Sequence, residues 1–413
     1  MSKKILVLFI ATIMLASLAL IQGSAKTTYY MGDVKIGIIV PSQAGVEKQT
    51  ALKDYLQIKA NQLNVGGTTA NFLFEIRTPD GYDQDSYLAD LDEFHINGVN
   101  FIIGDYWTYD AKYSIAYINA KGMLMVSPSC TGSNLACPND NLYRMSPDDS
   151  FNSRAVEDML KTSGVNEIII IKNAQIGGDT FEPINTVPVV SVVSYWPIWS
   201  DPARLDMEFN YVLQRAESLA SAEAQKGKSV ALVLIGADTN ALLSKAGSGS
   251  YPNLYNLNWY RFDYWSGIPA DLAQEAAHVH LYTATQANPP NGDAVFNAMK
   301  SDYAAKMGRD PNELDLNDAL TYDCAMVTAR SILTAKSTTL QNVISVLPTV
   351  SGSYLGATGY CVLDANGDRA NPYFNMIGFY VKDPTTNPST VDLQVYGHCD
   401  YYLKKGTVWT TPP

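Results

Sequence analysis

The hydrophobic positions of the chain fall into short apolar runs that alternate with longer amphipathic segments. The run VKIGIIV at residues 34–40 predicts a buried strand, and the following segment TALKDYLQIKANQLN carries apolar residues at helical spacing. A strand at 72–76, a helix at 84–97 and a strand at 99–103 continue the pattern. Strands that alternate with helices of this length predict a parallel, doubly wound α/β sheet.

A second series of strands and helices begins near residues 146–150. Helices are predicted at 150–163 and 206–224, and apolar strands at 167–172 and 230–235. A chain of 413 residues is long enough to bury more than one hydrophobic core. The sequence therefore predicts two α/β lobes, each built on its own doubly wound parallel sheet.

The stretch TATQANPPNGD, at residues 283–293, has the composition of a linker. Helices are predicted after it, at 292–307 and 314–335. Two helices cannot easily form a domain alone, so we expect them to return and cover the first sheet. These boundaries assign residues 33–148 and 286–352 to lobe I, and residues 149–285 and 353–413 to lobe II.

The N-terminus has the pattern of an export signal. Lys3 and Lys4 precede an apolar run from Ile5 to Ile21, and Gly23-Ser24-Ala25 resembles a small-residue cleavage site. We interpret residues 1–25 as a cleaved signal peptide, with an uncleaved membrane anchor as the alternative. Either interpretation places the remainder outside the cytoplasm, in the periplasm or at the cell surface.

The charge balance and the missing motifs restrict the function. The net charge is −12, and it becomes −14 when Lys3 and Lys4 leave with the signal peptide. Nucleic acids and anionic membrane surfaces are poor partners for such an acidic chain. The sequence contains no GxSxG, GxxxxGK[ST] or HExxH motif, which argues against an enzyme. We expect no catalytic residue, no cofactor and no metal site.

Five cysteines are present, and disulfides are permitted in an oxidising compartment. Cys130 and Cys137 enclose a short polar loop, and a bridge between them would stabilise it by roughly 2–3 kcal/mol. Cys361 and Cys399 lie in two β-rich stretches and are a second candidate pair. Cys324 lies in a helical run and is predicted to be a buried free thiol. No CxxC spacing occurs, so a zinc or redox site is not indicated.

The stretch from Val99 to Leu135 reads as a strand, a helix and a second strand, and each strand ends in a small polar cluster. Trp107 and Thr108 follow the first strand, and Ser129 and Thr131 follow the second. The carboxyl ends of neighbouring parallel strands meet at the edge where open α/β sheets bind ligands. Hydroxyl and backbone N–H groups at this edge predict half of a site for an anionic group of a small ligand.

Five local patterns occur in a characteristic order, namely VNFIIGDYWTYDA, KGMLMVSPSCTGSNL, LYRMSPDD, ALTYDCAMVTARSI and GATGYCVLDANGDR. In this order and spacing the chain resembles the type I periplasmic (solute-)binding protein family, of the branched-chain amino-acid-binding kind. The resemblance covers roughly residues 33–385. It implies two doubly wound lobes joined by a three-strand hinge, which close on a ligand between them.

The resemblance also implies roles for individual residues. Thr108, Ser129 and Thr131 match the first-lobe positions that hold the ligand carboxylate. Asp263, in WYRFDYW, matches the second-lobe acid that binds the ligand ammonium. Asp238, after the strand that ends at residue 235, is a weaker candidate for the same role.

Each of these residues also has a structural alternative. Thr108 is a suitable N-cap for the following helix, and Ser129 and Thr131 are suitable turn hydroxyls that bind their own backbone. A buried carboxylate at Asp263 needs a partner, which is a ligand ammonium, the nearby Arg261 or solvent. The sequence alone leaves these choices open.

The chain departs from the family pattern close to the predicted site. Trp107 stands beside Thr108 where the family has a small residue, so we expect it to narrow the site or to stack on a cyclic ligand. The segment KNAQIGGDTFEP lacks the family's tyrosine, and PSQAGVEKQ lacks its Thr-Gly pair. These departures leave the ligand class open.

The function implied by the resemblance is that of an extracytoplasmic solute-binding protein of an ABC importer. It would bind a small polar ligand, such as an amino acid or a related acid or amide, and present it to a membrane ABC permease. Two alternatives remain, a ligand-binding sensor coupled to a receptor and an exported hydrolase.

Overall fold

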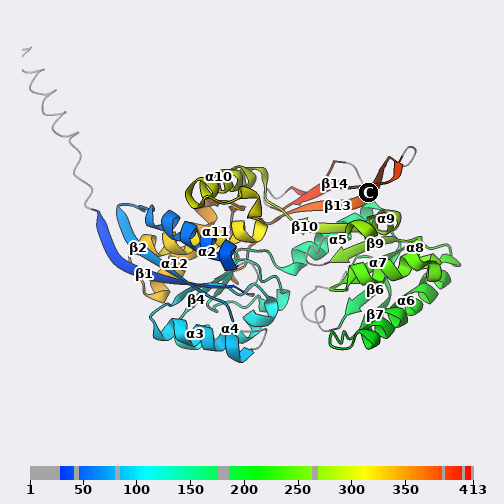
Figure 1. The fold of residues 1–413 in the computed structure, drawn as a ribbon, viewed down its shortest axis with the longest axis horizontal. Coiled ribbons are helices and arrows are strands. Elements are labelled where there is room, and N and C mark those ends of the chain that lie inside the picture. The colour runs from blue at the N-terminus through cyan, green and yellow to red at the C-terminus, as the bar shows by residue number, and fades with distance from the viewer. Residues whose placement is uncertain are drawn as a thin grey trace, which may run out of the picture.

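The computed structural model contains two α/β lobes that lie side by side (Figure 1). Each lobe has a sheet with helices packed on both faces, which confirms the predicted fold class. The predicted signal peptide lies outside the described residues. Among the described residues, no helix combines the length and apolar character needed to cross a bilayer. The described residues are 28–40, 46–79, 84–174, 186–262, 268–383, 387–401 and 405–410.

The first lobe is built on a five-stranded parallel sheet in the order β2-β1-β3-β4-β5. Every residue of β3 and β4 is buried. Continuous apolar runs of this kind are typical of parallel strands that helices cover on both faces. The strands are β1 (Tyr29–Ile39), β2 (Thr68–Arg77), β3 (Phe101–Ile103), β4 (Leu124–Ser127) and β5 (Leu142–Arg144).

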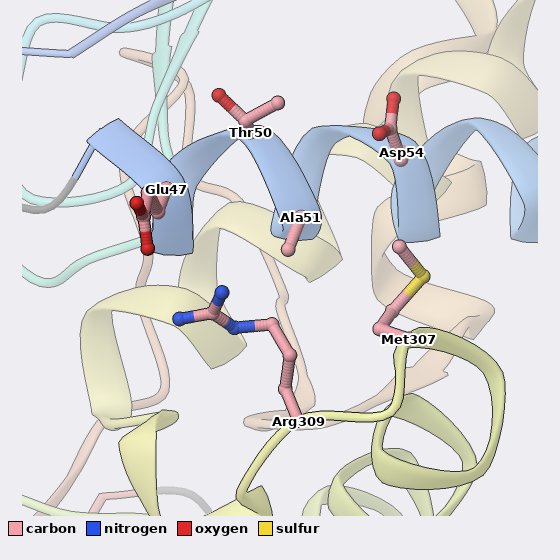
Figure 2. A pocket seen from close by; sticks show the side chains of 6 residues that line it. All are labelled: Glu47, Thr50, Ala51, Asp54, Met307 and Arg309. Carbon is pink, nitrogen blue, oxygen red and sulfur yellow. The ribbon is translucent and has the colours of Figure 1, made fainter.

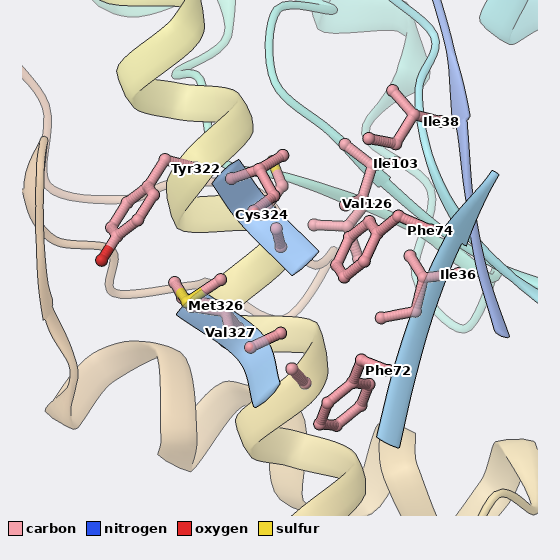
Figure 3. Close-up of a cluster of buried hydrophobic side chains, with 14 of the residues drawn as sticks. Ile36, Ile38, Phe72, Phe74, Ile103, Val126, Tyr322, Cys324, Met326 and Val327 are labelled. Carbon is pink, nitrogen blue, oxygen red and sulfur yellow. The ribbon is translucent and has the colours of Figure 1, made fainter. Parts of the chain in front are cut away.

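Among the described residues, six helices cover the two faces of the first sheet. α2, α10, α11 and α12 form one core with the strands, and α3 and α4 pack on the opposite face. Figure 3 shows side chains of this core, among them Phe72 of β2, Ile36 of β1 and Val327 of α11. The helices after residue 290 therefore return to the first sheet, as predicted. Their bounds are α2 (Val46–Asn61), α3 (Gln84–Ile96), α4 (Thr108–Lys121), α10 (Pro290–Met307), α11 (Leu316–Ala335) and α12 (Leu340–Ser353).

The second lobe has an eight-stranded sheet in the order β15-β14-β13-β10-β9-β8-β6-β7. The five strands from β10 to β7 are parallel, and the three C-terminal strands extend them in antiparallel pairing. The strands are β6 (Glu167–Asn173), β7 (Val189–Tyr195), β8 (Val230–Ile235), β9 (Asn258–Phe262), β10 (Tyr282–Gln286), β13 (Tyr373–Asp383), β14 (Asn387–Asp400) and β15 (Gly406–Trp409).

Helices also cover both faces of the second sheet. Residues of α6, α7, α8 and α9 share one core with the strands, and α5 packs on the other face. The long helix α6 begins with an Asp N-cap and a proline in its first turn, as its sequence favours. The helices are α5 (Asp149–Thr162), α6 (Pro202–Ala224), α7 (Thr239–Lys245), α8 (Pro252–Tyr255) and α9 (Ala273–His278).

In the described part of the chain, three crossovers connect the lobes. The first crossover runs from Arg144 at the end of β5 to Asp149 at the start of α5. The second joins β10 to α10 through residues 287–289. The third leads from residue 363, in the first core, to Tyr373, where β13 begins. Because β5 and β10 both leave their sheets at carboxyl ends, the first two crossovers lie at the edges where the candidate ligand residues lie.

The third crossover begins later than the predicted boundary at residue 353. The short strands β11 (Leu355–Gly356) and β12 (Gly359–Tyr360) pair with each other and pack on α10 and α12 of the first lobe. The cause is the buried Asp323 of α11, whose carboxylate accepts hydrogen bonds from Ala357 N at 2.7 Å and Thr358 N at 2.8 Å. A Cβ on Gly356 would overlap this carboxylate, so the turn requires glycine.

All five cysteines are free, so neither of the predicted disulfides is present. Cys130 is buried, and its Sγ donates to the carbonyl of Asp105 at 2.7 Å, whereas Cys137 is exposed. Cys361 packs in the first lobe's core and Cys399 in the core of the second. Two cysteines in different cores do not meet the short Cα–Cα separation that a disulfide needs.

Candidate functional site

The predicted ligand residues of the first lobe lie at the carboxyl ends of β3 and β4. The strand order reverses beside them, since β2 lies on one side of β1 and β3, β4 and β5 lie on the other. Open α/β sheets bind ligands in the crevice at such a reversal. Two segments meet there, which we call the β3 loop (residues 104–108) and the β4 loop (residues 127–132).

Two serine hydroxyls join these loops. Ser127 Oγ donates to Asp105 O at 2.6 Å, and Ser129 Oγ donates to Tyr106 O at 2.6 Å. A serine hydroxyl has a single hydrogen, so Ser129 has none left to donate to a ligand carboxylate. Ser129 therefore holds the neighbouring loop in place, which differs from the turn hydroxyl bound to its own backbone that the sequence offered as an alternative.

Thr108 is the first residue of α4, and the N-cap position belongs to Trp107. The structure thus excludes the simple N-cap role that the sequence allowed for Thr108. Its Oγ1 accepts a hydrogen bond from Gly132 N at 3.0 Å, and a Cβ on Gly132 would overlap the Thr108 side chain. A hydroxyl that accepts one hydrogen bond still has its own hydrogen, so Thr108 keeps a donor for an anionic group.

Thr131 contacts Asp149, the first residue of α5, across the junction of the lobes. Its carbonyl accepts from Asp149 N at 2.7 Å, and its hydroxyl donates to the Asp149 carboxylate. Asp148 takes the N-cap position and accepts from Ser150 N at 2.8 Å. Asp149 is therefore not needed as the cap, and burial raises the pKa of its carboxyl.

Asp105 is the residue of this region that the sequence analysis missed. It is completely buried and has a left-handed backbone conformation, with φ of 54°. Its carboxylate accepts hydrogen bonds from the hydroxyls of Tyr87 and Ser114, yet burial raises the pKa of Asp105 to about 7. The only signal in the sequence is an acid directly after an apolar strand and a glycine.

Of the two acidic residues predicted for the second-lobe side of the site, the structure describes only Asp238. Asp238 follows β8, beside the corresponding reversal of strand order in the second sheet. Its carboxylate caps α7 by accepting from Ala241 N at 3.0 Å, and its own N–H donates to the hydroxyl of Tyr195 at 3.0 Å. Asp263 lies outside the described residues, and the neighbouring Arg261 is buried in β9.

Trp107 adds an aromatic surface beside Thr108. The indole is 37% exposed, and Tyr109, the second residue of α4, is 54% exposed and packs edge-on against Tyr113 at 4.8 Å between ring centroids. A partly exposed indole next to a hydroxyl donor suits a ligand with an apolar face. The structure thus places Trp107, Thr108, Ser129 and Thr131 at one edge of the first sheet, and their contact with a ligand stays a prediction.

A surface hollow of about 370 Å³ lies elsewhere on the first lobe, between α2 and the end of α10 (Figure 2). None of its lining residues belongs to the β3 or β4 loop, and its Arg309 is already paired with Glu313 at 2.6 Å. We place the candidate site at the strand ends, because the reversal of strand order lies there. Among the described residues no group of three His, Cys, Asp or Glu side chains is arranged to hold a metal ion. The hollow is lined by Glu47, Thr50, Ala51, Asp54, Met307 and Arg309.

Comparison with known sequences does not identify the family of this chain. No family model matches the chain. An uncharacterized protein of Methanocaldococcus jannaschii is 22% identical over 266 residues, which cover 60% of each chain. The matched part of the chain thus spans about three fifths of the length of this relative.

Comparison with solved structures identifies the fold. An ABC transporter substrate-binding protein from Desulfitobacterium hafniense, in complex with Leu, matches 88% of this chain and 100% of its own, with a TM-score of 0.62 and 17% identity. The leucine-binding protein LivK from Thermotoga maritima matches 87% and 97%, with a TM-score of 0.61 and 17% identity. A periplasmic binding protein from Burkholderia mallei matches 92% and 98%, with a TM-score of 0.63 and 14% identity. The chain therefore has the fold of type I periplasmic binding proteins.

Proposed function

We propose that this protein is an extracytoplasmic solute-binding protein that binds a small zwitterionic ligand, such as an amino acid, between its lobes. Ligand contacts to both lobes would stabilise the closed arrangement, and a membrane ABC permease would recognise it. Proteins of the same fold include a leucine-binding protein and an ABC transporter substrate-binding protein in complex with Leu. Delivery of the ligand requires no catalytic residue and no cofactor.

The observation that carries this proposal is the pair of free donors at the strand ends of the first lobe. Thr108 Oγ1 accepts from Gly132 N and keeps its hydrogen. Within the described part of the chain, the backbone N–H of Thr131 has no acceptor. Thr108 is the first residue of α4, and a helix N-terminus favours negative charge. A ligand carboxylate fits this arrangement.

The acidic groups near this site suit the ammonium of the same ligand. Asp149 lies within hydrogen-bond reach of the Thr131 hydroxyl. Desolvation disfavours its charged form, so a positive group beside it would replace water that the carboxylate has lost. Asp263 remains the second-lobe acid proposed from the resemblance, and Asp238 remains a weaker candidate because it caps α7.

Titration calorimetry of the purified protein with L-leucine, L-isoleucine, L-asparagine and L-glutamate tests the proposal. A thermal-shift measurement gives an independent signal, because a ligand at 100 times its dissociation constant adds about 2.7 kcal/mol of stability. We expect at least one of these amino acids to bind. Loss of the hydroxyl in Thr108→Val should weaken that binding about tenfold or more, since hydrogen bonds to charged groups contribute about 1.5–3 kcal/mol.

Thr162→Val is the matched control. Thr162 is an exposed threonine at the end of α5, and its hydroxyl donates to Asp158 O within the same helix. The same chemical change there should leave binding unchanged. Binding of none of the four amino acids, or equal affinity in Thr108→Val and Thr162→Val, would contradict the proposal.

The proposed location and partners follow from the N-terminal segment and the fold. We propose that residues 1–25 direct export, and that the mature lobes act at the outer face of the membrane with a permease as partner. Export of a fusion between residues 1–28 and a periplasmic reporter enzyme tests the first step. Mass spectrometry of the mature N-terminus then distinguishes cleavage after Ala25 from retention as an anchor.

A further inference from the structure

All three carbonyl groups from Cys130 to Gly132 bind donors of the first crossover. Arg144 Nη1 donates to Gly132 O at 2.7 Å and to Cys130 O at 3.4 Å. The backbone N–H of Asp149 donates to Thr131 O at 2.7 Å. The first crossover thus binds three consecutive carbonyls of the β4 loop, and movement of the loop breaks these hydrogen bonds unless the crossover moves with it.

The same arginine is fixed to the segment that leads into the third crossover. Arg144 Nε donates to Asp368 Oδ1 at 2.5 Å, and Arg144 N donates to Gly367 O at 3.0 Å. Both partners of this ion pair are buried. Breaking a buried pair leaves an uncompensated charge, so removal of either partner would destabilise the contact between the first and third crossovers.

Hydrogen bonds continue from this pair to the candidate site. Arg144 binds Gly132 through its carbonyl, and Gly132 binds Thr108 Oγ1 through its N–H. An unbroken series thus runs from Asp368 through Arg144 and Gly132 to the Thr108 hydroxyl. This series connects the crossovers, which would change if the lobes rotate, with the groups that would contact a ligand.

We propose that Arg144 is a positioning residue that couples the arrangement of the crossovers to the β4 loop. This proposal takes its ligand from the proposed function. The contacts that Arg144 makes with the crossovers and the β4 loop involve no ligand. Coupling is reciprocal, so a ligand that orders the β4 loop also favours one arrangement of the lobes. Arg144 touches no ligand in this scheme and acts only through Gly132 and Cys130.

Amide hydrogen exchange of the ligand-free protein tests the proposal in two variants. Arg144→Lys keeps a charge beside Asp368 but lacks the second nitrogen that reaches the β4 loop carbonyls. Asp368→Ala keeps the guanidinium but removes its anchor. In both variants we expect amides of residues 129–135 to exchange about tenfold faster, as for the loss of one charge-assisted hydrogen bond. Amides of β1 should exchange at the wild-type rate, because a local change leaves the sheet intact.

Glu93→Gln is the control, because it removes an exposed ion pair with Arg77 in the same lobe. We expect no change in residues 129–135 for this variant. Unchanged exchange there in Arg144→Lys overturns the proposal, and so does a uniform increase that includes β1, which would mean a purely structural role. If Asp368→Ala does not fold, Arg144→Lys decides alone, since its buried charge stays paired.

Calorimetry with L-leucine separates this proposal from the proposed function. If the wild-type protein binds L-leucine, Arg144→Lys should bind it about tenfold more weakly, and restoring arginine should restore the affinity. Absence of binding by the wild-type protein to all four amino acids counts against the proposed function only. The exchange measurement still supports or overturns the role of Arg144 in that case.

Discussion

Replacing Asp105 by asparagine should make the stability of the first lobe less sensitive to pH. Asp105 is completely buried, and burial raises its pKa from 3.8 to about 7, although Ser114 and Tyr87 donate to it. Between these two pH values the folded state binds more protons than the unfolded state. Stability contributed by this carboxyl is therefore fully present below pH 3.8 and is lost as the pH rises through about 7.

The size of the effect follows from the same shift. A difference of about three pH units, at about 1.4 kcal/mol each, corresponds to about 4 kcal/mol between acidic and neutral pH. Asparagine has nearly the same shape as the protonated acid and also tolerates the left-handed backbone conformation of this position. We expect Asp105→Asn to match the wild-type protein near pH 4 and to exceed its free energy of unfolding by up to about 4 kcal/mol near pH 8.

Urea unfolding followed by circular dichroism at both pH values measures this difference. Other buried acids, such as Asp318 and Asp323, also have pKa values raised by burial. They are present in both the wild-type protein and Asp105→Asn, so their contributions cancel in the difference in unfolding free energy. Asp271→Asn, at an exposed position, is the control for the change in net charge. If the stability difference between Asp105→Asn and wild type is the same at pH 4 and pH 8, the reasoning about this carboxyl is refuted.

Three further changes test the packing of both lobes by urea unfolding. Gly356→Ala should destabilise the first lobe by about 3 kcal/mol or more, because the added Cβ would overlap the buried carboxylate of Asp323. An unchanged unfolding midpoint would mean that the turn can shift. Trp259→Phe should destabilise the second lobe by about 2 kcal/mol, because it removes the indole N–H that donates to Leu254 O at 2.9 Å. An unfolding midpoint equal to that of the wild-type protein would show that this hydrogen bond does not stabilise the lobe. Asp148→Ala should cost about 1 kcal/mol as the loss of an N-cap, and a glycine at the same position should restore most of it.

Much of the architecture follows from local patterns in the sequence. Apolar runs such as residues 34–40 mark strands that are covered on both faces, and helical spacing marks the helices between them. The small polar residues after β3 and β4 lie at one edge because parallel strands end on the same side of a sheet. These features depend on contacts within one strand, one helix or one pair of neighbours, so periodicity is sufficient to predict them.

The identity of the buried polar partners is not visible in those patterns. The sequence allowed two disulfides, but Cys361 and Cys399 belong to different cores. It also singled out Ser129 and Thr131 without their partners Tyr106 and Asp149, which come from other elements. A hydroxyl has the same local signal whether it binds a ligand, its own backbone or a neighbouring loop, and only the packing of the chain decides among these.

The sequence by itself therefore determined two doubly wound lobes, the return of the last helices to the first sheet, and the sheet edge at which the first-lobe candidate residues lie. The tertiary structure alone decided that Asp105 is buried, that Arg144 joins Asp368 to Gly132, and that residues 355–363 pack with the first lobe. The physical reason is the range of the interactions. Hydrophobic periodicity reports burial residue by residue, whereas a buried charge finds its partner 224 positions away in the chain, where no local pattern can point to it.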